Sequence, residues 1–189
     1  VTVLRRSSDS GLSSAVMAGM EASRGDVIAV IDADMQHDET VLPEMVRRIN
    51  EQGADIAVGT RGADGGSYGS FSTFRRFVSW VAATIARVLL RVPVTDPMSG
   101  FFALSRQAYR ESAPSVNPQG FKILLEFIGR NPQLTISEVG YEFRSRVAGE
   151  TKLAPSVIRS YLLAVFELRF GKRVKGQFFL YSLVGASGV

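Results

Sequence analysis

The stretch VIAVIDADMQH, residues 27–37, decides the fold. Its opening run, VIAVI, is uninterrupted and apolar, which is typical of a strand buried on both faces of a parallel sheet. Asp32 and Asp34 follow at the carboxyl end of this strand. A second apolar run, IAVG at 56–59, predicts another buried strand, and Arg61 comes just beyond its end.

The rest of the chain alternates helical and extended patterns. Helical spacing or long apolar runs predict helices over 13–23, 41–49, 74–90, 121–130 and 157–170, and extended patterns predict strands over 100–105 and 134–143. Strands that alternate with helices indicate an α/β fold with a mostly parallel sheet and flanking helices. Ligands of such sheets bind at the carboxyl ends of the strands, where Asp32, Asp34 and Arg61 lie.

Composition narrows the possible functions. The chain has 189 residues with no cysteine and one histidine, which excludes disulfides, a cysteine nucleophile and a metal site built from several histidines of one chain. Lysine and arginine number 22 against 18 acidic residues, a net charge of +4. This mild excess admits anionic partners such as phospholipid headgroups and phosphorylated substrates. Without a basic stripe or a reading helix, we expect no nucleic-acid partner.

The Asp32-Ala33-Asp34 sequence is the sharpest chemical feature. Two carboxylates beside each other at a strand end can hold Mg²⁺, which prefers one or two carboxylates together with phosphate oxygens of a substrate. An ordinary aspartate-rich turn is the alternative. A phosphatase of the haloacid dehalogenase type is disfavoured, because Gln36 stands where that family carries threonine. His37 fits either a hydrogen-bonding role at the edge of the site or a surface position.

Several arginines flank the expected strand ends or the Gly- and Ser-rich loop at 63–72: Arg61, Arg75, Arg76 and Arg146. The planar guanidinium donates two parallel hydrogen bonds, so arginine suits phosphate recognition. For each of them, a solvated surface position is the alternative.

The helix expected over 74–90 and the C-terminal third of the chain are rich in apolar residues. The helix expected over 74–90 is apolar on nearly every face, and the one over 157–170 has few charges. Basic residues at 172, 173 and 175 precede an apolar run over 178–189, which is shorter than the roughly 20 residues that span a bilayer. This run is either a buried core segment or the start of a membrane helix with basic residues at its cytoplasmic edge.

Six motifs taken together resemble one family. The chain is similar to dolichol-phosphate mannose synthase and its bacterial polyprenyl-phosphate relatives, which are inverting glycosyltransferases of family 2, in AVIDADMQHDE (29–39), ADIAVGTR (54–61), FRRFVS (74–79), DPMSGFFALSR (96–106), GFKILLE (120–126) and RVAGETKL (146–153). The resemblance implies a Rossmann-like A-type fold whose N-terminal, nucleotide-binding strands are missing. It divides the chain into a partial catalytic domain (1–156), an amphipathic juxtamembrane helix with a basic linker (157–176) and the start of a truncated transmembrane domain (177–189).

The resemblance also implies site residues. Asp32 and Asp34 match the pair that binds Mg²⁺ or Mn²⁺ and the diphosphate of a nucleotide sugar, and Gln36 matches a residue that faces the sugar. Arg61 matches the family's basic residue after the second of the two strands. The residues matched to the lipid phosphate are Arg75 and Ser79, and those of the basic segment that closes over the phosphates are Arg146 and Lys152. The family more often has serine where Thr151 stands and often has proline where Asp38 stands.

The implied reaction is metal-dependent, inverting transfer of a hexosyl group from a nucleotide sugar of the GDP-mannose or UDP-glucose type to polyprenyl or dolichyl phosphate, at the cytoplasmic face of a membrane. Such a phosphate is already ionised near neutral pH, because its second pKa is about 6. A chain with a single histidine could therefore catalyse it without a general base. We expect the chain alone to be an inactive fragment. The alternatives are a non-catalytic membrane-associated module that retains the fold, or another magnesium-dependent phosphoryl- or nucleotidyl-transferring enzyme.

Overall fold

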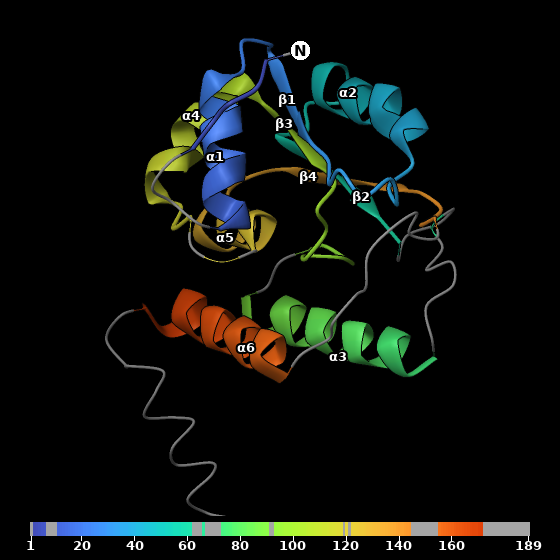
Figure 1. The fold of residues 1–189 in the computed structure, drawn as a ribbon, viewed down its shortest axis with the longest axis vertical. Coiled ribbons are helices and arrows are strands. Elements are labelled where there is room, and N and C mark those ends of the chain that lie inside the picture. The colour runs from blue at the N-terminus through green and yellow to red at the C-terminus, as the bar shows by residue number, and fades with distance from the viewer. Residues whose placement is uncertain are drawn as a thin grey trace, which may run out of the picture.

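The structure, a computed structural model, describes residues 2–6, 11–61, 66, 73–90, 93–118, 120, 122–144 and 155–171, with side chains omitted at 73–79 and 155–160. The helices are α1 (Leu12–Ala22), α2 (Leu42–Asn50), α3 (Thr73–Leu90), α4 (Arg106–Ser112), α5 (Ile123–Arg130) and α6 (Pro155–Phe170). The strands are β1 (Val27–Val30), β2 (Ile56–Thr60), β3 (Phe102–Ser105) and β4 (Ile136–Gly140), and short 3-10 turns cover Glu39–Val41 and Ala113–Ser115 (Figure 1). The sequence therefore predicted the four strands and five of the six described helices, apart from their exact ends, and missed α4.

The amphipathic sequence of α2 shows why it folds where it does. Pro43 stands in its first turn, where a missing N–H costs nothing, and Met45 and Ile49 are buried one turn apart on the face toward the sheet. Past the end of the helix, Gly53 has a φ of 70°, which a glycine adopts without a steric penalty. The chain then enters β2.

The sheet is mixed, so the prediction of a mostly parallel sheet was wrong. The strand order is β1-β3-β2-β4, with β2 and β4 parallel but β3 antiparallel to both of its neighbours. The α3 helix does not return the chain to the opposite end of the sheet, as a crossover helix would. It lies beyond the edge at which β2 ends, so the next strand runs back from that edge (Figure 1).

The prediction that β1 and β2 are both buried was correct for β2 and wrong for β1. Every residue of β2 is buried, as predicted. The prediction that β1 is buried on both faces was wrong, because Ala29 is exposed and Ile31, just beyond the strand, is 42% exposed. Among the described residues β1 pairs only with β3 and is therefore the outermost strand of the sheet.

Two apolar cores lie on the two faces of the sheet. Side chains alternate along a strand, so in β2 Ile56 and Val58 face one core and Ala57 faces the other. The first core is covered by α1, α4 and α5, and the second by α2 (Figure 1). This packing fixes the strand ends, from which the candidate site is built.

The α3 and α6 helices form a further layer beyond the strand ends (Figure 1). The Tyr161 hydroxyl of α6 donates a hydrogen bond to the Ala82 carbonyl of α3 at 2.5 Å, and a small apolar cluster joins both helices to α5. Within the described part of the chain, no helix is both long and apolar enough to cross a membrane. Three predicted segments lie outside the described residues: the loop at 63–72 (of which only Gly66 is described), the basic cluster after 171, and the apolar run over 178–189.

Candidate active site

The candidate site lies at one edge of the sheet, where three strands end and one begins. Because β1, β2 and β4 run in the same direction, the segments after each of them meet there, together with the segment that leads into β3. These segments supply Asp32 and Asp34 after β1, Arg61 after β2, residues 96–101 before β3, and residues 141–144 after β4. Chain direction thus confirms that Asp32, Asp34 and Arg61 share an edge.

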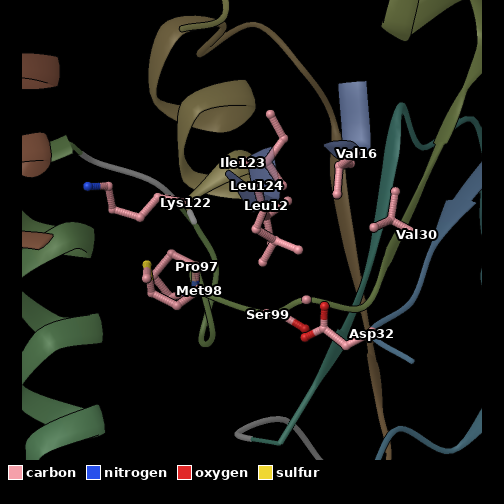
Figure 2. Close-up of a pocket in the computed structure, with 11 residues that line it drawn as sticks. Leu12, Val16, Val30, Asp32, Pro97, Met98, Ser99, Lys122, Ile123 and Leu124 are labelled. Atoms are coloured by element: carbon pink, nitrogen blue, oxygen red, sulfur yellow. The ribbon is translucent and has the colours of Figure 1, made fainter. Parts of the chain in front are cut away.

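The Asp32 carboxylate lies close to a glycine and a histidine. A Cβ atom at Gly100 would overlap Asp32 Oδ2 and would lie only 2.7 Å from its Cγ, so only glycine leaves room for this carboxylate. Asp32 Oδ2 also lies 3.6 Å from Nε2 of His37. Figure 2 shows Asp32 beside the turn that carries Ser99. The Asp32 side chain stays 39% exposed, which leaves it accessible to a ligand.

The turn after Asp32 is strained and tied down. Met35, which is 67% exposed, has a φ of 62°, a conformation that non-glycine residues adopt rarely and mostly where function or packing imposes it. The Gln36 backbone N–H donates to Asp34 Oδ1 at 3.2 Å. The buried Gln36 amide donates to the Arg144 carbonyl at 3.1 Å, and the Arg144 N–H donates back to the Gln36 carbonyl at 2.9 Å. Two hydrogen bonds thus anchor this turn to the segment after β4, while contact of Gln36 with a sugar stays a prediction.

His37 is buried, so the surface alternative for it was wrong. Its ring lies among the rings of Phe101, Tyr141 and Phe143, at centroid distances of 5.3 to 5.5 Å. Nδ1 lies 2.6 Å from the Tyr141 hydroxyl, and Nε2 faces Asp32. Both ring nitrogens therefore face polar groups inside an aromatic enclosure.

Arg61 is held by a buried ion pair. Its Nε and Nη2 atoms lie 2.8 and 2.6 Å from Asp96 Oδ2, and the side chains are 16% and 8% exposed. The guanidinium carbon also lies 4.9 Å from the centre of the Phe143 ring, within the range of a cation–π contact. Arg61 is therefore fixed in position rather than solvated, which removes the surface alternative for this arginine.

The electrostatics of Tyr141 show that these groups form one site. Burial raises the pKa of its hydroxyl; the positive charge of Arg61 opposes this shift, and the negative charges of Asp96, Asp32 and Asp34 add to it. All four charged side chains are therefore close enough to act on one phenol. The site combines two accessible carboxylates with an arginine–aspartate pair around a neutral tyrosine.

Comparisons with known proteins agree with this arrangement. Residues 1–112 match the family described as Glycosyl transferase family 2. The chain belongs to that family.

Among the curated relatives of this family 2 chain, the dolichol-phosphate mannosyltransferase of Pyrococcus furiosus is 36% identical over 191 residues, which cover 100% of the chain and 53% of the relative. The enzyme of the same name from Saccharomyces cerevisiae is also 36% identical, over 89% of the chain and 64% of its own length. The chain thus spans between half and two thirds of these relatives. The resemblance seen in the motifs is confirmed.

Solved structures agree at the level of the fold. Glucosyl-3-phosphoglycerate synthase from Mycobacterium tuberculosis, in a complex with Mn²⁺, UDP and glucosyl-3-phosphoglycerate, superimposes with a TM-score of 0.64 at 18% identity. The match covers 89% of the family 2 chain and 58% of the synthase chain. The chain therefore shares the mixed α/β fold of this synthase.

Sequence reasoning missed a group of residues that shape the site of this family 2 chain. The Ser99 hydroxyl donates to the Gly59 carbonyl at 2.6 Å, and the Thr95 N–H and hydroxyl both donate to Glu138, at 2.7 and 2.8 Å. Together with Asp96 and Gly100, these contacts fix the turn before β3 against β2 and β4. The DPMSG motif was the available signal, because it contains Asp96, Ser99 and Gly100.

A small apolar pocket adjoins Asp32 on the side of α1 and α5 (Figure 2). Val16, Val30 and Met98 line it, and Lys122 stands at its border with its amino group directed away from Asp32. Burial lowers the pKa of Lys122, and the carboxylates of Glu126 and Glu167 oppose that shift. The Lys122 amino group is therefore within electrostatic range of Glu126 of α5 and Glu167 of α6.

The structure does not place every predicted site residue. Arg75, Arg76 and Ser79 lie in the first turns of α3, where only the backbone is described, and Arg146 and Lys152 lie outside the described residues. The described part of the chain holds no group of three or more acidic, histidine or cysteine side chains suited to a metal ion.

Proposed function

We propose that the protein catalyses inverting transfer of a hexosyl group from a nucleotide sugar to a polyprenyl or dolichyl phosphate. The convergence of Asp32, Asp34 and the Arg61–Asp96 pair around Tyr141, at the carboxyl ends of the strands, carries this proposal. Membership of glycosyl transferase family 2 and the names of the curated relatives support it. Donors of the GDP-mannose or UDP-glucose type both fit the observations.

The aspartate pair fits a divalent cation. Mg²⁺ takes one or two carboxylates together with oxygens of a bound phosphate, and Asp32 and Asp34 offer two partly exposed carboxylates on one turn. These two residues would hold Mg²⁺ or Mn²⁺. In support, the structurally similar synthase has been solved with UDP and either of these ions. When bound, the ion would neutralise charge on the departing nucleoside diphosphate.

The acceptor needs no general base from this chain. A lipid monophosphate carries an ionised oxygen near neutral pH, and this oxygen attacks the anomeric carbon while the bond to the nucleoside diphosphate breaks on the opposite face. His37 would be a poor base for this step, because it is buried against Tyr141 and Asp32. Catalysis then rests on positioning and on charge.

The arginines would orient the phosphates. Asp96 fixes the Arg61 guanidinium beside the aspartate turn, so this cation is in place before any substrate binds. We assign Arg75 and Ser79 to the lipid phosphate, and Arg146 and Lys152 to the segment that closes over the donor. These four assignments follow from the motifs, so each is a target for mutagenesis.

The layer formed by α3 and α6 would meet the membrane surface. Large apolar side chains of both helices are exposed, and arginines accompany them: Trp80, Val88 and Leu89 with Arg87 on α3, and Leu162 and Phe170 with Arg169 on α6. Helices of this kind lie in the interfacial plane of a bilayer, where tryptophan is favoured. We propose that this layer brings the site to the cytoplasmic face, with 157–176 as the juxtamembrane helix and linker and 177–189 as the start of a membrane segment.

Substitution of Asp34 tests the proposal. In the complete gene product, Asp34→Ala should lower hexosyl transfer from GDP-mannose or UDP-glucose to polyprenyl phosphate by at least about 100-fold, because it removes half of the carboxylate pair. The matched control is Asp26→Ala, which removes an exposed carboxylate before β1, at the opposite end of that strand. Equal transfer rates of both variants and the wild type would contradict the proposal. Phosphate release without any acceptor lipid would instead favour a phosphoryl-transferring enzyme.

A further inference from the structure

His37 is the single histidine of the sequence, and its surroundings are unusually well defined. The side chain is 6% exposed, yet each ring nitrogen faces a polar group: Nδ1 lies 2.6 Å from the Tyr141 hydroxyl and Nε2 lies 3.6 Å from Asp32 Oδ2. Aromatic packing alone would be served as well by phenylalanine. A buried polar ring costs free energy unless its nitrogens find partners, so the two polar neighbours call for an explanation.

The partners select one tautomer of the ring. An ionised carboxylate only accepts hydrogen bonds, so Asp32 favours a proton on the Nε2 that faces it. Burial raises the pKa of Tyr141, so its phenol keeps its proton and can donate to an unprotonated Nδ1. The Tyr141 O–H then donates to Nδ1, while the Nε2–H faces Asp32 Oδ2 at an N···O distance of 3.6 Å, which is an electrostatic contact and not a hydrogen bond.

We propose that His37 is a positioning residue for Asp32, held by Tyr141 in the tautomer that carries its proton on Nε2. The Nε2–H faces Asp32 Oδ2, and the backbone at Gly100 lies against the same carboxylate, so both contacts favour the orientation seen in the structure. The carboxylate stays 39% exposed and therefore accessible to a ligand. Outer partners of this kind commonly orient carboxylate and histidine ligands of metal ions. The inference rests on the proposed function in so far as it takes Asp32 to be a ligand of the metal and donor.

Nitrogen NMR of the histidine ring tests the tautomer without reference to activity. In protein labelled with ¹⁵N-histidine, the signal of His37 is the one lost in His37→Gln. We expect a protonated Nε2 and an unprotonated Nδ1 in the wild type, and partial loss of this preference in Tyr141→Phe. A proton on Nδ1 in the wild type would overturn the proposal.

Two substitutions of His37 test its effect on Asp32. Glutamine can place an amide N–H near the position of Nε2, whereas asparagine reaches only the position of Nδ1. In the complete gene product with GDP present, Mn²⁺ titration followed by electron paramagnetic resonance should show an affinity about tenfold weaker for His37→Asn and within about threefold of wild type for His37→Gln. Equal affinities in both variants, with melting temperatures matching the wild type, would overturn the proposal.

The two parts of the reasoning fail in different ways. If the wild type binds no Mn²⁺ with either GDP or UDP present, the proposed metal role of Asp32 fails, while the NMR experiment still decides whether Tyr141 sets the tautomer. If His37→Asn does not fold, Tyr141→Phe replaces it, because that change removes one hydroxyl and leaves the aromatic packing of His37 in place. We expect weaker Mn²⁺ binding in Tyr141→Phe, and wild-type affinity together with an unchanged tautomer would count against the proposal.

Discussion

Substitution of Gly100 by alanine should damage the candidate site without unfolding the protein. Gly100 is not among the glycines with a positive φ, so alanine can adopt its backbone conformation. The added methyl group would overlap Asp32 Oδ2 and lie 2.7 Å from Asp32 Cγ. Any loss of function would therefore come from a side-chain collision and not from a strained backbone.

The size of the effect follows from the overlap. Non-bonded carbons pack at about 3.5 to 4.0 Å, so the Asp32 carboxylate has to move by about 1 Å. Because this side chain is 39% exposed, it can turn toward solvent at little cost in stability. A misplacement of this size at a reacting centre lowers the rate by about 100-fold, which corresponds to about 2.7 kcal/mol of transition-state stabilisation.

The assay is hexosyl transfer to polyprenyl phosphate by the complete gene product, together with its melting temperature. The matched control is Gly19→Ala in α1, where an added Cβ meets nothing within 4 Å. That control should retain full activity and raise the free energy of unfolding by about 0.5 to 1 kcal/mol, because alanine favours the helix over glycine. Full activity of Gly100→Ala would refute the placement of Asp32 against Gly100, and with it the reason for glycine at this position.

Two further predictions concern stability. Asp96→Asn should lower the free energy of unfolding by about 1 to 3 kcal/mol, because it removes the carboxylate to which the largely enclosed Arg61 guanidinium donates. Replacing both residues by methionine and leucine should cost less, and a larger cost of the double change in chemical denaturation would contradict this reasoning. Hydrogen bonds from Arg47 and Arg48 lower the pKa of the partly exposed Glu44 to about 2, so its stabilising effect is present above about pH 4.5 and is lost as the pH falls toward 2. Melting temperatures of Glu44→Gln and wild type should therefore converge over that range, and a constant difference would argue against the effect.

The sequence predicted most helices and strands, and the end of the sheet that carries Asp32 and Asp34, because these depend on local patterns. Apolar runs that end in Asp32 and near Arg61 define two strands and their carboxyl ends. Because the two strands run in the same direction, these ends lie on the same side of the sheet. The same local pattern misled us about β1. An apolar run looks the same in an outermost strand as in a central one, so the exposure of Ala29 and Ile31 could not be predicted.

The supporting residues could not be predicted because their partners are distant in sequence. His37 meets Tyr141 across 104 positions, and Arg61 meets Asp96 across 35. No local periodicity indicates such pairs. The direction of β3 was missed for a related reason, since hydropathy shows that α3 is a helix but not whether it crosses the sheet.

The position of β3 between β1 and β2 has a consequence during protein synthesis. Among the described strands, β1 and β2 are joined only through β3, and the turn that carries Gln36 meets Arg144 across 108 positions. At translation rates of about 5 to 20 residues per second, the aspartate turn leaves the ribosome on the order of 5 to 20 s before Arg144 does. A nascent chain that stalls between β3 and β4 can already pair β1, β2 and β3, yet its aspartate turn lacks Tyr141, the partner of His37, and Arg144, the partner of Gln36.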